Sequence, residues 1–137
     1  MPVQFKIAIT KAILEHCKNC GTGNEAHNIG KECAVAYALR DIFPNVYVTN
    51  YYIFPLGIDF EKGQDIKIPM PLIAQQFIRL FDGFHFSPNL RLLLPEFEFT
   101  IDVPDEVIEQ INIDEVRALI ERGKKTINLR KHQLALC

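Results

Sequence analysis

The sequence predicts an α+β fold in which a small mixed or mostly antiparallel sheet carries helices packed mainly on one face. Residues 3–9 and 97–103 alternate apolar and polar side chains with a period of two, which is typical of half-buried strands. Helical patterns lie between them, but the strands outnumber a regular β-α-β alternation. A parallel α/β sheet is therefore the less favoured alternative.

The size of the chain bounds its domain organisation. It has 137 residues, 48% of them hydrophobic and 23% charged, which suits one core. Ten Phe and four Tyr residues can anchor that core. We expect one α+β domain over residues 1–123 and a C-terminal tail over residues 124–137 that is basic at first and then apolar.

Charge and hydropathy narrow the classes of partner. The net charge of −2 argues against a broad basic surface for nucleic acid, so nucleic acid is not an expected partner. No segment approaches the roughly 20 apolar residues that span a bilayer, and the N-terminal residues lack an apolar run of signal-peptide length. We expect a cytoplasmic protein with reduced cysteines, no membrane partner, and a protein partner or self-association as open alternatives.

The first strand leads into two predicted helices. Thr10 is a good N-cap for a helix over residues 11–18. Residues 19–30 are rich in Gly and Asn and predict a loop. A second helix is expected over residues 29–43, because Pro44 disfavours a helical conformation just before it. Its expected core face consists of Val35, Ala38, Leu39 and Ile42.

The middle of the chain predicts short strands and one well-delimited helix. Residues 46–54 are rich in Val, Ile and aromatic residues and predict one strand or a tight pair around Asn50. Residues 66–68 predict a further short strand. A helix is expected over residues 70–82, with Gly83 after its last turn. Its expected core-facing residues are Ile73, Phe77, Leu80 and Phe81.

After the strand over residues 97–103, two short helices are expected. Pro104 opens the first of them, with acidic residues in its first turn where the helix dipole favours them. Asn112 is the expected cap of a second helix over residues 113–122, which Gly123 closes.

Three of the four cysteines and one histidine form the strongest candidate for chemistry. Cys17, Cys20, His27 and Cys33 spell C-x2-C-x6-H-x5-C. Zinc prefers four tetrahedral sulfur and nitrogen ligands, and a C-x2-C start is a common ligand pair. The set therefore predicts a candidate structural zinc site, in which His16 could replace His27. In the alternative interpretation, Cys33 is simply a buried core residue.

Two catalytic hypotheses use the same region and the last predicted strand. Cys33 near a helix N-terminus, with His27 as its base, would make a thiol nucleophile. Glu96, Glu98 and Asp102 share the polar face of one strand, and paired carboxylates can serve in acid–base chemistry. Alternation alone also produces such a row as a solvated face, and this simpler interpretation is favoured.

Three segments in order, CAVAYALR, FIRLFDG and PEFEFTIDVP, resemble a family of small, uncharacterised bacterial and phage proteins. That family has a Cys-Pro-x-Ala-x-Ala-Leu helix, a Phe-Ile-Arg-x-Phe-Asp helix and a Phe-Glu-Phe strand. The resemblance spans roughly residues 10–103 and implies a shared small α+β fold but no activity. Ala34 departs from the pattern, because the family has Pro there. The matching positions are Cys33, Ala36, Ala38, Leu39, Arg40, Phe77, Ile78, Arg79, Phe81, Asp82, Phe97 and Phe99.

The sequence thus favours a small non-enzymatic interaction or binding protein. The first alternative is a zinc-stabilised module, built on Cys17, Cys20, His27 and Cys33, that contacts nucleic acid or protein. The second alternative is a thiol enzyme that uses Cys33 and His27. None of the motifs forms a catalytic set that meets the usual criteria for an active site.

The zinc hypothesis predicts about one zinc per chain in protein purified under reducing conditions without a His-tag. Elemental mass spectrometry measures this directly. Cys20→Ser should abolish the metal content, and losing the metal should loosen residues 17–33, because structural zinc contributes folding energy. Metal-free protein with free thiols in this segment would contradict the hypothesis.

Overall fold

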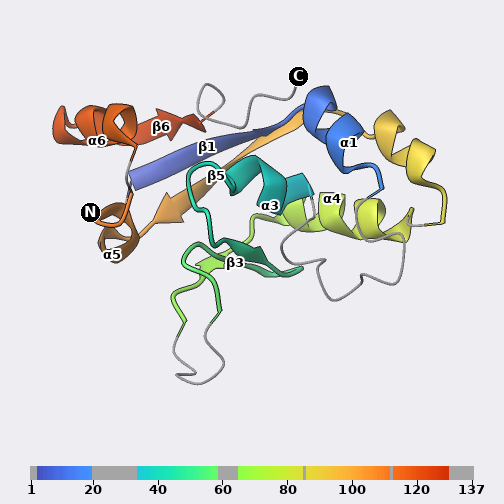
Figure 1. The fold of residues 1–137 in the computed structure, drawn as a ribbon, viewed down its shortest axis with the longest axis horizontal. Helices are drawn as coiled ribbons and strands as arrows, with labels where there is room; N and C mark the ends of the chain where they lie inside the picture. The colour runs from blue at the N-terminus through green and yellow to red at the C-terminus, as the bar shows by residue number, and fades with distance from the viewer. Residues whose placement is uncertain (1–2, 20–33, 59–64, 85, 112, 130–137) are drawn as a thin grey trace.

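Two three-stranded sheets organise the chain, which we describe from a computed structural model (Figure 1). The structure describes residues 3–19, 34–58, 65–84, 86–111 and 113–129. The first sheet has the order β5-β1-β6 and the second the order β2-β3-β4. The predicted α+β class is confirmed. The strands are β1 (Val3–Ile9), β2 (Tyr47–Val48), β3 (Tyr52–Phe54), β4 (Ile68–Pro69), β5 (Phe97–Val103) and β6 (Thr126–Asn128).

The first sheet is built on the two strands that the period-two pattern predicts. β1 and β5 run antiparallel, with Val3 opposite Val103 and Ile9 opposite Phe97. The apolar residues of both strands are buried almost throughout, whereas β5 exposes its polar residues. One face of this sheet is therefore covered and the other faces solvent, as an antiparallel sheet allows.

The third strand of this sheet comes from the segment that the sequence analysis assigns to a tail. β6 runs parallel to β1, and the Gln4 backbone N–H donates to the Lys125 carbonyl oxygen at 2.8 Å. Ile127 and Leu129 are buried. Residues 126–128 thus belong to the sheet, while residues 130–137 lie outside the part of the chain that the structure describes.

The first helix after β1 begins as predicted, whereas the predicted start of the second, near residue 29, lies outside the described residues. α1 (Lys11–Cys17) starts at Thr10, whose side-chain oxygen accepts from the Ile13 backbone N–H at 3.3 Å. α3 (Ala34–Leu39) ends well before Pro44, and the chain continues in turns in which the Leu39 carbonyl accepts from two later N–H groups. All four predicted core residues of this segment are buried.

In the second sheet, β2 and β3 form the tight antiparallel pair that was one of the two predicted alternatives. Thr49 organises the turn between them. Its side-chain oxygen accepts from the backbone N–H groups of Tyr51 and Tyr52 at 3.3 and 3.0 Å. β4 then pairs antiparallel with β3, which completes a small meander.

Helix α4 (Leu72–Gly83) turns a different face to the core than the sequence analysis predicts. Its buried row is Ala74, Phe77, Ile78 and Phe81. The prediction that Ile73 and Leu80 face the core is wrong, because their side chains are 48% and 52% exposed. The helix is apolar over much of its circumference, so periodicity alone does not select the buried row.

The C-terminal elements are short. A 3-10 helix, η2 (Pro88–Leu93), follows α4. α5 (Asp105–Ile108) and α6 (Asp114–Glu121) follow β5 where two short helices are predicted. Gly123 closes α6 with a φ of 87°, a conformation that glycine adopts without strain.

One buried arginine ties three of these elements together. Arg91 in η2 is 1% exposed. Its Nε donates to the Phe81 carbonyl in α4 at 2.7 Å, and a terminal nitrogen donates to the Lys18 carbonyl after α1 at 2.9 Å. The guanidinium carbon also lies 3.9 Å from the centre of the Phe81 ring. Both carbonyls belong to helix C-terminal ends, whose partial negative charge stabilises a buried cation.

Lys11 makes the reciprocal link from α1 to η2. Its Nζ donates to the carbonyl oxygens of Leu92 and Leu94 at 3.0 and 2.6 Å. Figure 1 shows α1 and η2 side by side at one end of the first sheet, in keeping with their direct contact. Arg91 and Lys11 therefore hold η2 to α1 from both sides.

Replacing Arg91 should destabilise the whole domain. Arg91→Met leaves two helix-terminal carbonyls without these donors, and we expect a loss of about 3 kcal/mol in the free energy of unfolding, measured by urea denaturation. Arg91→Lys should recover little, because an ammonium lacks the planar fork that reaches both carbonyls. Arg122→Met, at an exposed position, should change stability by less than about 0.5 kcal/mol. Equal stability of Arg91→Met and the native protein would refute this role.

Candidate functional site

The exposed apolar side chains of the described residues gather in one short segment. Eight large apolar side chains are exposed among the described residues, and six of them lie between residues 72 and 93. We call these six the α4–η2 face: Leu72 (67% exposed), Ile73 (48%), Leu80 (52%), Phe86 (89%), Leu90 (41%) and Leu93 (76%). Single exposed apolar residues are ordinary, but a concentration of this kind makes the segment the candidate interaction surface.

On α4, the exposed apolar residues lie on one side of the helix. Ile73 and Leu80 are seven residues apart, which places them within about 20° of each other around the axis. Gln76 lies between them on the same side. Leu72 flanks this row, and Arg79 is exposed farther round the helix. The outer side of α4 is thus an apolar stripe with one amide at its middle.

On η2, the buried side chain of Arg91 determines which residues point outward. Successive turns of a 3-10 helix repeat every three residues, so Leu90 and Leu93 lie one above the other. Arg91 is drawn inward by the Phe81 and Lys18 carbonyls, which leaves Leu90 and Leu93 on the outside. The same arginine attaches η2 to the C-terminal turn of α4, so the two parts of the α4–η2 face are joined by one side chain.

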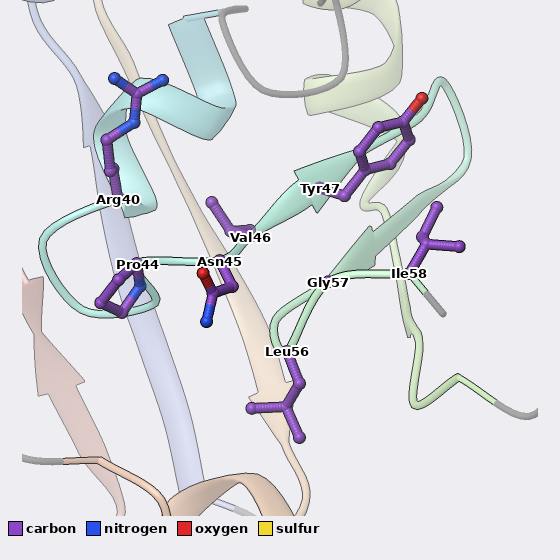
Figure 2. Close-up of a pocket in the computed structure, with 8 residues that line it drawn as sticks. All are labelled: Arg40, Pro44, Asn45, Val46, Tyr47, Leu56, Gly57 and Ile58. Carbon is purple, nitrogen blue, oxygen red and sulfur yellow. The ribbon is translucent and has the colours of Figure 1, made fainter. Parts of the chain in front are cut away.

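A separate cavity of about 470 Å³ lies between residues 40–47 and the loop after β3. Figure 2 shows the guanidinium of Arg40 and the hydroxyl of Tyr47 at opposite ends of the lining group, with the Asn45 amide directed away from both. Ligand sites need a few polar groups that converge on one ligand, and these three diverge. The lining residues are Arg40, Pro44, Asn45, Val46, Tyr47, Leu56, Gly57 and Ile58.

Gly57 fixes one wall of this cavity. Its φ is 84°, and a Cβ at this position would lie 2.9 Å from the Asn45 carbonyl oxygen. The loop after β3 therefore packs directly on the segment before β2, and only glycine allows that approach. The cavity is a consequence of how these two loops meet.

Of the predicted zinc ligands, only Cys17 lies within the described residues. It ends α1, and its side chain is fully buried in the core. Cys20, His27 and Cys33 lie outside the described residues, so the zinc site and the Cys33/His27 thiol pair both stay predictions. His16, the alternative ligand, is exposed and places its ring 4.3 Å from that of Tyr37. Within residues 3–19, 34–58, 65–84, 86–111 and 113–129, no group of three or more His, Cys, Asp or Glu side chains could hold a metal.

The carboxylates at the start of β5 have structural partners. Glu96 accepts from the Lys11 backbone N–H at 2.8 Å, which places a negative charge at the N-terminus of α1. Glu98 forms an ion pair with Lys6 on the neighbouring strand at 3.0 Å. Asp102 is exposed opposite Gln4. These contacts favour the interpretation of this row as a solvated, structurally engaged face.

Comparisons with known proteins leave the family resemblance untested. No protein-family model matches the chain, and no curated protein or solved structure matches it significantly. Among the described residues, no helix is both long enough and apolar enough to cross a bilayer.

The α4–η2 face was missed by sequence reasoning, because Ile73 and Leu80 were assigned to the core. The excess of apolar residues around α4 was the signal that could have revealed it.

Glu96 should stabilise the fold through α1. We expect Glu96→Ala to lower the free energy of unfolding by about 1 kcal/mol, because the first turn of α1 loses an acceptor and a favourable charge. Glu98→Ala should cost about 0.5 kcal/mol, as for other exposed ion pairs. Asp102→Ala is the matched control on the same face and should leave the urea midpoint unchanged. An equal effect of all three substitutions would argue against capping by Glu96.

Proposed function

We propose that this chain is a small non-enzymatic interaction protein that binds another protein surface through the α4–η2 face. The observation that carries the proposal is that residues 72–93 hold six of the eight large apolar side chains exposed in the described part of the chain. A protein interface needs such an apolar centre within a polar rim. Gln75 and Arg79 supply polar groups along α4 for that rim.

The charges around this face favour protein over nucleic acid or a membrane surface. Residues 72–93 contain one acid, Asp82, and two arginines, of which Arg91 is buried. A nucleic-acid site needs several accessible cations for the phosphates. A helix that lies on a membrane is typically rich in Lys and Arg on its polar face. The α4–η2 face has neither property, whereas an apolar, nearly uncharged patch suits the centre of a protein interface.

Coverage of the face in cells is the direct test. Leu80→Cys places a thiol in the α4–η2 face, and Thr100→Cys places one at an exposed position on the opposite, polar face of the first sheet. We expect alkylation of the Leu80→Cys thiol to be several-fold slower in cells than in dilute purified protein, because a partner covers it. Mass spectrometry of the labelled peptides measures both rates.

The control thiol separates coverage from general effects of the cell interior. Alkylation of the Thr100→Cys thiol should slow only by the factor common to any exposed thiol in the cell. If the Leu80→Cys thiol slowed by no more than this factor, nothing would cover the α4–η2 face and the proposal would fail.

A further inference from the structure

We infer that the partner which covers the α4–η2 face is a second copy of this chain, with the two α4 helices packed antiparallel. This inference rests on the proposed function, because it names the occupant of the same face. It follows from the order of side chains along α4, from the area exposed and from the distribution of charge.

The exposed row of α4, which consists of Ile73, Gln76 and Leu80, is nearly symmetric about a point near the middle of the helix. A twofold axis that passes between Gln76 and Phe77 would place Ile73 of one copy opposite Leu80 of the other, and Leu80 opposite Ile73. Gln76 would meet Gln76 of the other copy near the axis. Each amide can donate and accept, so the two can pair with each other. Such self-complementarity is what a twofold interface requires.

The residues beyond α4 extend this arrangement at both ends. In an antiparallel pair, the C-terminal end of one helix lies beside the N-terminal end of the other. Phe86, which follows α4, would therefore approach Leu72 at the start of the second copy's helix. Leu90 and Leu93 are exposed on η2, which Arg91 attaches to the last turn of α4. A contact that extends from α4 to η2 would bury all six side chains of the α4–η2 face.

The exposed area is of the right size for a pair of chains. Leu, Ile and Phe side chains at these exposed fractions present on the order of 100 Å² each, so the six present on the order of 600 Å² per copy. A standard specific interface buries about 800 Å² per partner, and the central Gln76 together with flanking side chains such as Arg79 supplies the remainder.

Charge does not oppose the contact. Arg79 is the exposed cation of α4, and the twofold axis separates the two copies of it by about 7.5 Å along the helices. Each Arg79 would lie at the same height along the helices as Ala74 of the other copy. It would stand at the rim of the contact, accessible to solvent. The apolar centre therefore holds no pair of like charges, which would otherwise reject a second copy.

Sedimentation velocity over a concentration series up to the millimolar range tests the inference. The native chain should reach twice the mass of one chain, and Leu80→Glu should remain a single chain at every concentration. Leu72→Glu should also prevent pairing, although an acid at the start of α4 favours the helix dipole. Its effect therefore cannot be attributed to unfolding. Thr100→Glu, on the opposite face, should pair like the native chain.

The antiparallel geometry has its own test. Under mild oxidation, Gln76→Cys should form a disulfide between copies, because position 76 of one copy would be offset from position 76 of the other by only about 1.5 Å along the helix axes. Arg79→Cys should form it far more slowly. Peptide mass spectrometry identifies the linked cysteines and separates these products from those of the native thiols.

The outcomes distinguish the inference from the proposed function. A single chain at all concentrations, or pairing that survives both Leu80→Glu and Leu72→Glu, would overturn self-association through this face. If the Leu80→Cys thiol were still protected in cells, the interaction function would stand with a different protein as partner. If that thiol were unprotected as well, both would fail.

Discussion

The burial of Arg91 is the constraint on which this end of the molecule depends. A guanidinium at 1% exposure is tolerated only when hydrogen bonds and partial charges replace its water. The carbonyls of Phe81 and Lys18 supply this replacement from the ends of two helices, and the Phe81 ring covers one side of the cation. α1, α4 and η2 must therefore stop where they do, because a different end point would move the carbonyls away.

The same constraint shapes the surface. η2 is a short 3-10 helix with little internal stability of its own, and two cations hold it: Arg91 from within and Lys11 from α1. Because the side of η2 that carries Arg91 faces the core, Leu90 and Leu93 lie on the side that faces solvent. An apolar patch on the outside is thus coupled to a polar anchor on the inside.

Local patterns in the sequence predict the elements better than they predict the packing of those elements. The period-two alternation identifies β1 and β5, and Thr10 identifies the start of α1, because both signals act through neighbouring residues. Which row of α4 is buried depends on the elements that pack against the helix. Because apolar residues also lie on its other side, the sequence pattern does not distinguish the two rows. Nothing local marks Arg91 as buried, since its partners lie 10 and 73 positions away. The candidate site could not be predicted for the same reason. Its residues are apolar, and only their position on the surface distinguishes them from core residues.

The position of β1 in the first sheet also bears on how the chain folds. β1 precedes both of its pairing partners in the chain by a long way, because β5 and β6 begin with residues 97 and 126. A nascent chain therefore carries an apolar strand whose hydrogen-bonding edges have no native partner until residues 97–103 and 126–128 have been synthesised. Contacts this distant slow folding and prolong the time during which such an edge can join the wrong strand. The central strand that secures the finished sheet is thus also the most exposed to misassembly during biosynthesis.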